Sequence, residues 1–145
     1  IANIHIDSGS ANNVLSTNGS GTLSWVTRAT LAQNTFTAQQ VITPVSLTDG
    51  STIAVDATLS NNFKLILTAS GHTLSNPTGL VNGQVLNFFI KQGAAGSMTL
   101  TFDTMYDFGA AGAPVQITTS NGRDCVTCYY DATDNILISN FRKGS

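Results

Sequence analysis

Apolar and polar residues alternate with a period of two along most of the chain. Residues i and i+2 of a β-strand share one face, so this period is typical of strands with one buried side. The alternation predicts strands near residues 41–47, 53–57, 115–117 and 136–138. It is cleanest in four runs: Phe63/Leu65/Leu67/Ala69, Leu86/Phe88/Ile90, Met98/Leu100/Phe102 and Val126/Cys128/Tyr130.

Clusters of Gly, Asn, Asp, Ser and Pro separate the predicted strands. They lie at residues 48–51, 59–62, 75–79, 81–83, 93–96, 109–114, 120–122 and 131–135. These residue types favour the tight turns that join neighbouring strands. Short strands at this spacing predict an all-β fold, an antiparallel β-sandwich or a jelly-roll-like arrangement. Residues 28–40 can hold a helical turn or two, and we interpret them as a connector.

The pattern changes near residue 35, which predicts a short neck at residues 1–35 and a head domain at residues 36–145. So short a neck cannot bury its own apolar side chains. Either sister copies of the chain cover them, which makes the neck an attachment and oligomerisation segment, or the neck folds back as extra strands of the head. The side chains concerned are Ile4, Ile6, Val14, Leu15, Leu23 and Trp25.

Composition narrows the classes of function. The 145 residues suit one domain with a short appendage, only 10% are charged, Glu is absent, and the formal net charge is −2. Nucleic-acid binding requires clustered cations, whereas the six Lys and Arg residues are scattered along the sequence, so we expect no nucleic-acid partner. Apolar stretches are too short to span a bilayer, so we expect no membrane insertion. Because residue 1 is Ile, we expect the chain to be processed or part of a longer polypeptide.

Cys125 and Cys128 form a C-x-x-C pattern within a predicted strand. Residues i and i+3 of a strand lie on opposite faces, about 10 Å apart, whereas a disulfide needs Cα atoms about 5.5–6 Å apart. Zinc needs further ligands, and His5 and His72 stand alone. Three copies of His5 could meet on the axis of a symmetric trimer, but the sequence offers no second set of metal ligands beside them. We therefore expect structural thiols, no metal and no cofactor.

Paired carboxylates are the first requirement for glycoside hydrolysis, at separations of about 5–9.5 Å. The candidate pairs are Asp103 with Asp107 and Asp131 with Asp134, but both fall where Asp is favoured for turn hydrogen bonds. His72 lies in an apparent turn, and the sequence has no Gly-x-Ser-x-Gly motif. We predict that the chain has no catalytic residues and is not an enzyme.

The segment at residues 14–26, Val-Leu-Ser-Thr-Asn-Gly-Ser-Gly-Thr-Leu-Ser-Trp-Val, resembles a motif that recurs in bacteriophage tail-fibre and other virion appendage proteins just before their heads. From Phe36 onward the chain is similar to a β-rich domain common in phage structural proteins. The matching pieces are residues 35–40, 74–77, 83–88, 91–96, 112–114, 129–131 and 136–138.

This resemblance implies a structural protein on the exterior of a phage particle, a homotrimeric tail or head fibre whose head takes part in host attachment. Its expected partners are sister copies and other virion proteins of the tail or capsid. Two alternatives stay open: a capsid decoration or cement protein bound to the shell, and a tailspike that degrades polysaccharide.

A head that binds a host glycan or protein would use turn residues that combine aromatic faces with amide or charged groups. The best-placed candidates are Tyr106, Asp107, Phe108, Asn121 and Arg123. Each also has a plainer interpretation, because aromatic residues at strand ends commonly cap a core and polar turn residues commonly face water.

Overall fold

The computed structural model describes residues 13–17, 19–27 and 41–144. The chain divides into two compact units, Ile1–Gln40 and Val41–Ser145, which are described separately below. The predicted boundary at residue 35 and the connector at residues 28–40 lie outside the described residues.

The first unit contains a β-hairpin. Strand β1 (Asn13–Thr17) pairs with β2 (Leu23–Thr27) in antiparallel fashion, with Leu15 opposite Trp25 and Thr17 opposite Leu23. Gly19 and Gly21, in the connecting turn, have φ values of 81° and 83°, a region that glycine enters without steric cost. This explains why a Gly-rich stretch separates the two strands.

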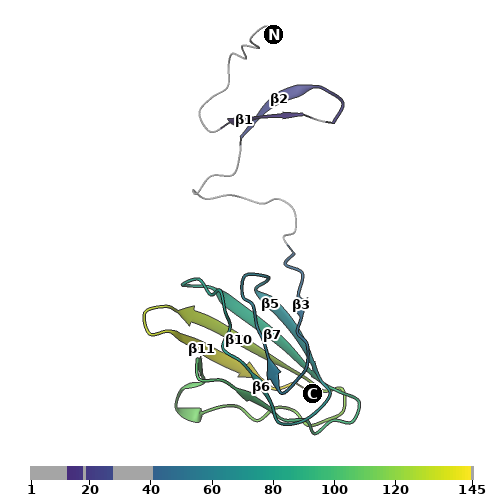
Figure 1. The fold of residues 1–145 in the computed structure, drawn as a ribbon, viewed down its shortest axis with the longest axis vertical. Helices are drawn as coiled ribbons and strands as arrows, with labels where there is room; N and C mark the ends of the chain where they lie inside the picture. The colour runs from purple at the N-terminus through teal and green to yellow at the C-terminus, as the bar shows by residue number, and fades with distance from the viewer. Residues whose placement is uncertain (1–12, 18, 28–40, 145) are drawn as a thin grey trace. The chain divides into compact units, whose positions relative to one another are not determined.

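The second unit consists of two sheets (Figure 1). A six-stranded sheet has the order β3 (Val45–Ser46), β5 (Asn62–Leu67), β7 (Val85–Gln92), β10 (Arg123–Asp131), β11 (Ile136–Arg142), β9 (Tyr106–Asp107). A three-stranded sheet has the order β4 (Thr52–Ile53), β6 (His72–Leu74), β8 (Leu100–Phe102). A 3-10 turn at Gly109–Ala111 is the one helical element in the described ranges, so the all-β prediction is confirmed there. Those ranges contain no helix long and apolar enough to cross a membrane.

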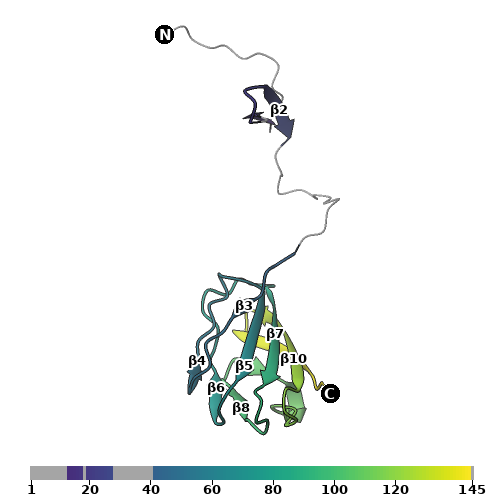
Figure 2. The ribbon, with the colours of Figure 1, turned by 90° about the vertical axis from the view of Figure 1, so that its right-hand side faces the viewer.

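From β3 to β8 the chain alternates between the two sheets. It therefore forms three stacked coils, β3–β4, β5–β6 and β7–β8, and each coil adds one parallel strand to each sheet. Figure 2 shows β4 and β6 forming a layer beside that of β5, β7 and β10. The β10–β11 hairpin then extends the larger sheet in antiparallel fashion from β7.

The prediction of antiparallel pairing is correct for β1–β2, β7–β10 and β10–β11 and wrong for the remaining strand pairs, including β9–β11. A period of two marks a half-buried strand in either orientation, so it carries no information on direction. Parallel neighbours need a long crossover, and the path from β5 to β7 provides one by way of β6 in the other sheet.

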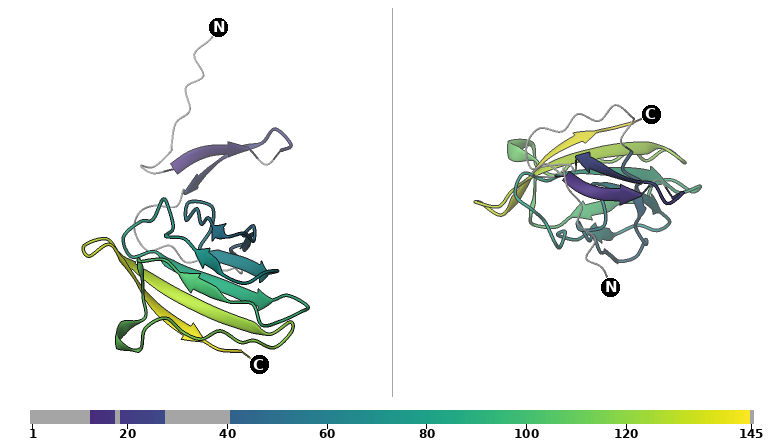
Figure 3. Two further views of the ribbon diagram at one scale, coloured as in Figure 1. Left: turned by 60° about the horizontal axis from the view of Figure 1, so that its bottom comes forward. Right: turned by 90° about the horizontal axis from the view of Figure 1, so that it is seen from above.

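Side chains from both sheets meet in one core. Figure 3 shows the backbone of the two sheets in two further views. The stacked coils place Phe63 directly beside Phe88, with ring centroids 5.4 Å apart and planes 20° apart. The ring of Tyr106 meets Phe88 edge-on at 6.1 Å. The other buried members of the cluster are Ile53, Val55, Ala57, Leu65, Leu67, Leu74, Leu86, Ile90, Leu100, Val126, Cys128 and Leu137.

Buried polar groups in the second unit are paired. Gln92 is 1% exposed, and its amide bonds to both backbone groups of Met98, donating to the carbonyl oxygen (2.9 Å) and accepting from the N–H (3.0 Å). Within the described part of the chain, every buried side-chain nitrogen or oxygen has a hydrogen-bond partner. Such pairing removes the cost of burying polar atoms and fixes the turn after β7.

Candidate functional site

One face of the β1–β2 hairpin is apolar and exposed. Leu15 and Trp25 are opposite each other and each 37% exposed, and Leu23, two residues before Trp25, is 58% exposed. Alternation places these three side chains on the same face. Of the other predicted oligomer contacts, Val14 pairs in register with Val26, whereas Ile4 and Ile6 lie outside the described residues, as does His5.

Tyr106, the first predicted receptor contact, is a core residue. Its side chain is only 7% exposed, and its hydroxyl donates to the backbone oxygen of Ser75 (3.2 Å). Burial raises the pKa of the Tyr106 hydroxyl above its ordinary value. The prediction that Tyr106 belongs to a binding surface is therefore wrong, because β9 turns this ring inward against Phe88 and Phe102.

The remaining predicted receptor residues do not form one surface. Phe108 is half-buried against Phe102 (centroids 4.9 Å apart), and exposed Asp107 accepts the N–H of Gly109 (2.7 Å). These residues neighbour the Asp131 end of β10, since β9 pairs with β11 at Leu137. Asn121 and Arg123, both exposed, lie at the opposite end of β10, about 20 Å away at 3.4 Å per residue.

The structure instead brings four cations together on the outer face of the six-stranded sheet. They surround a groove of about 660 Å³ whose floor includes Phe89, 45% exposed, and Ile66, 53% exposed. Strand pairing places Ile66 beside Lys91 and Lys91 beside Arg123. The adjacent row runs across five strands: Ser46, Lys64, Phe89, Cys125 and Arg142. We call this site the cationic groove and define it by Lys64, Phe89, Lys91, Arg123 and Arg142.

The cations of this groove have no acidic partner in the described ranges. The one ion pair found there joins His72 to Asp49, and none of the four cationic side chains makes a hydrogen bond. Asp124 also belongs to the groove lining, but its side chain is 4% exposed and its carboxylate accepts the N–H groups of Ile117 (2.8 Å) and Gly144 (3.0 Å). The groove therefore retains uncompensated positive charge.

Sequence reasoning missed the cationic groove because its residues come from four strands that lie far apart in the sequence. A usable signal was nonetheless present. Lys64, Lys91, Arg123 and Arg142 all occupy outward positions of strands whose alternate residues are buried or half-buried. What the sequence lacked was the strand order, which converts scattered cations into one cluster.

Cys125 and Cys128 lie on opposite faces of β10, as predicted. Cys128 is completely buried, whereas Cys125 is half-buried and lines the cationic groove. Burial raises the pKa of the Cys128 thiol to about 11, although a hydrogen bond from the Ser139 hydroxyl (3.3 Å) acts in the opposite direction. Both thiols are free.

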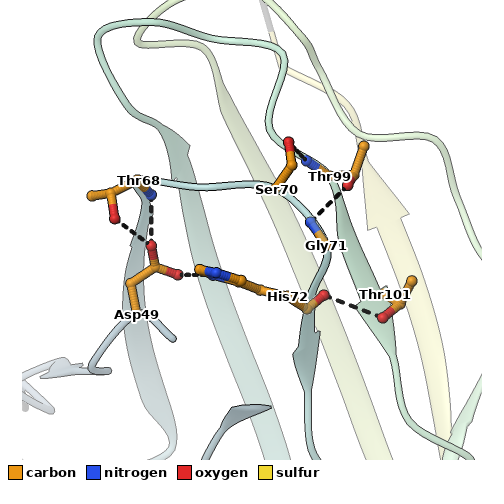
Figure 4. A network of polar contacts seen from close by, with 7 residues as sticks. All are labelled: Asp49, Thr68, Ser70, Gly71, His72, Thr99 and Thr101. Carbon is orange, nitrogen blue, oxygen red and sulfur yellow. Dashed lines mark hydrogen bonds and ion pairs between the residues drawn. The ribbon is translucent and has the colours of Figure 1, made fainter. Parts of the chain in front are cut away.

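His72 is not in a turn but on β6, where it joins a polar network (Figure 4). One carboxylate oxygen of Asp49 lies 2.7 Å from Nδ1 of His72, and the other accepts the N–H (2.6 Å) and hydroxyl (2.7 Å) of Thr68. Ser70 is the serine of this network, and its hydroxyl donates to the Ser97 carbonyl and accepts the Thr99 N–H. We interpret the network as a structural link between the first two coils.

Asp49 gives this link a pH dependence. Burial is the largest influence and raises its pKa, but the hydrogen bonds from Thr68 and His72 together outweigh burial, so the pKa lies below the ordinary 3.8. Because the pKa of Asp49 is lower in the folded state, its ionised carboxylate stabilises the fold at pH values above the ordinary pKa. This stabilisation is lost as the pH falls through the folded-state pKa. We expect Asp49→Asn to lower the thermal midpoint by about 5 °C at pH 6. Thermal scans should show this gap shrinking below about pH 4.

Asp134→Asn is the matched control, because Asp134 is exposed in the turn between β10 and β11. We expect its thermal midpoint to follow the wild-type midpoint at every pH. A gap between wild type and Asp49→Asn that stayed constant down to pH 2 would contradict the role assigned to the Asp49 carboxylate.

Three of the four paired aspartates accept hydrogen bonds within turns, as the sequence predicted. Asp103 accepts the N–H of Thr104 (2.7 Å), and Asp131 accepts that of Thr133 (2.8 Å). Together with the bond from Gly109 to Asp107, these contacts hold three carboxylates in local turn geometry. Within the residues that the structure describes, no three His, Cys or Asp side chains group as metal ligands do.

Comparison with known proteins gives no relative: no family model, no curated protein and no solved structure matches this chain. The candidate sites are therefore the apolar hairpin face and the cationic groove, and their interpretation depends on their geometry and chemistry.

Proposed function

We propose that the chain is a homotrimeric fibre protein on the exterior of a bacteriophage particle. In this proposal the first unit holds three copies together and joins them to other virion proteins. The second unit, which we propose to be a β-sandwich head, is presented to the host surface for adhesion. The chain acts by binding and assembly, with no catalytic step.

The observation that carries this proposal is the apolar face of the hairpin. An isolated two-stranded hairpin is marginally stable in water, and one face of this hairpin exposes Leu15, Leu23 and Trp25. Covering such a face removes apolar area from water at about 25 cal/mol per Å². Copies of the same chain are the simplest cover, because symmetric association brings identical apolar faces to a common axis.

The second unit supports the role of a head. Its buried apolar side chains form one core within residues 41–144, so the unit has a hydrophobic core of its own. Its charged groove lies on the outer face of a sheet, where a ligand has access. A self-sufficient β-domain attached to a hairpin that needs partners fits a division of labour between recognition and assembly.

The first test of this proposal is the mass of the assembled protein. We expect light scattering at micromolar concentration to give the mass of three chains, or about 45 kDa from the 15.1 kDa of one chain. A mass of one chain would contradict the proposal.

Antibody labelling of the particles that carry the chain is the second test. Label on tails or on fibres that project from the head supports the fibre, whereas an even coat on the shell would favour the capsid cement alternative. Loss of host polysaccharide in the presence of the purified protein would favour a tailspike enzyme.

A further inference from the structure

The cationic groove collects most of the positive charge of the chain on one face. Four of the six Lys and Arg residues of the sequence line it, and a fifth, Lys143, follows Arg142 directly. The four lining cations belong to four adjacent strands, spaced about 4.8 Å apart. Like charges this close repel one another, so an arrangement without acidic partners favours an anionic ligand.

The groove also offers an apolar floor. Phe89 lies between Lys64 and Cys125 in the row across the sheet, and Ile66 neighbours Lys91. A half-exposed aromatic ring surrounded by cations can stack on the flat apolar face of a sugar ring while the cations hold acidic substituents. A small inorganic anion would make no use of that floor.

The charge of the whole chain disfavours a densely charged ligand. The net charge is −2 despite the groove, so no general positive field attracts a nucleic acid to the molecule. An acidic polysaccharide carries one acidic group for every one or two sugars, so its anions lie further apart than the phosphates of a nucleic acid. It matches four separate cations better than a continuous row of phosphates does.

We propose that the cationic groove binds an acidic polysaccharide, with a sugar ring on Phe89 and its acidic groups on Lys64, Lys91, Arg123 and Arg142. This inference rests on the proposed adhesion function and names the class of ligand that the head recognises.

A second copy of the chain fits this groove less well. Three of the exposed or half-buried aspartates, Asp103, Asp107 and Asp131, already accept backbone N–H groups of their own turns. An external acidic polymer therefore fits the charge pattern better than a neighbouring head does.

The binding test uses the assembled wild-type protein and three immobilised acidic glycans: polygalacturonate, hyaluronate and polysialic acid. We expect binding to at least one of them, weakened by salt as a partly exposed electrostatic contact must be. Neutral dextran and polyglutamate, which lacks sugar rings, should bind at least about tenfold more weakly. No binding to any acidic glycan, or equal binding to polyglutamate, would overturn the proposal.

Matched variants locate the contact. Lys91→Gln combined with Arg123→Gln should weaken binding about tenfold, whereas Lys143→Gln, a cation outside the groove lining, should change it less than twofold. Phe89→Ala should weaken binding about threefold to tenfold. Tyr129→Ala is its control: Tyr129 is equally exposed on the same sheet face, about 14 Å further along the strands. Equal losses in test and control variants would contradict the assignment.

Cys125 provides a readout independent of affinity. Iodoacetamide at pH 8 should modify Cys125 and leave the buried Cys128 unmodified, and a bound glycan should protect Cys125. Protection by an acidic glycan but not by dextran supports the groove site. If Cys125 is unreactive in the trimer and Lys91→Glu releases single chains, a second copy occupies the groove and the glycan proposal fails. A trimer that binds no glycan refutes this inference alone, whereas a monomer refutes the proposed function.

Discussion

Replacing Trp25 by aspartate is expected to separate the proposed trimer into single chains. Trp25 and Leu15 face each other on the apolar side of the hairpin, and an aspartate there would place an unpaired carboxylate inside the interface. A buried tryptophan anchor alone contributes about 2 kcal/mol or more to an interface, and each trimer loses three. Light scattering should therefore show the mass fall from three chains to one at micromolar concentration.

Ser24→Asp is the matched control for this experiment. Ser24 is exposed on β2 next to Trp25, and strand alternation turns it to the other face of the hairpin. The same charge at this position should leave the mass of three chains unchanged. The circular dichroism of the second unit should be the same in both variants, since its core lies wholly within residues 41–144. A Trp25→Asp protein that keeps three chains would show that this hairpin face is not the interface.

The second large effect is expected from Phe88→Ala. The Phe88 ring is 1% exposed and lies between Phe63 and Tyr106, so its removal leaves a cavity where the two sheets meet. Core substitutions of this kind lower the free energy of unfolding by about 3–5 kcal/mol. Urea denaturation, followed by circular dichroism, should show an earlier midpoint with an unchanged slope.

Phe89→Ala is the natural comparison, because it removes the same side chain from the next residue of the same strand. Phe89 is 45% exposed on the outer face, so its loss should lower the free energy of unfolding by less than about 1 kcal/mol. The two neighbouring variants thus separate a core role from a surface role. Similar destabilisation by both would contradict the assignment of the two sheet faces.

The sequence predicts the long strands well because their pattern is local, but it also predicts a strand at residues 115–117, where the structure has none. Alternation at Phe63/Leu65/Leu67 and Leu86/Phe88/Ile90 marks the inward faces of β5 and β7, and these residues are all buried. The same logic placed Cys125 and Cys128 on opposite faces of β10. These predictions needed only the geometry of a single strand, which adjacent residues determine.

Pairing between strands depends on contacts that a local pattern does not contain. The parallel pairing of β5 with β7 and the clustering of Lys64, Lys91 and Arg142 follow from the strand order. The alternation of apolar and polar residues does not determine that order. Tyr106 shows a different limit: an aromatic residue at a strand end can face inward or outward, and the two-residue strand β9 is too short to show a period. The buried and exposed faces of the long strands could therefore be predicted from the sequence, whereas the location of the candidate site could not.

The stacked coils allow the second unit to change its outer surface without disturbing its interior. Val45 pairs with Phe63, and Phe63 pairs with Phe88. The second coil thus contains more residues than the first, yet each coil places an apolar residue in the same row across the sheet. Turns at the ends of the strands that lie outside the core tolerate insertion in the same manner. Foreign peptide loops grafted into the exposed turn at residues 132–134, between β10 and β11, would in this way be displayed on an unaltered scaffold, a useful property for a protein engineered to recognise new targets.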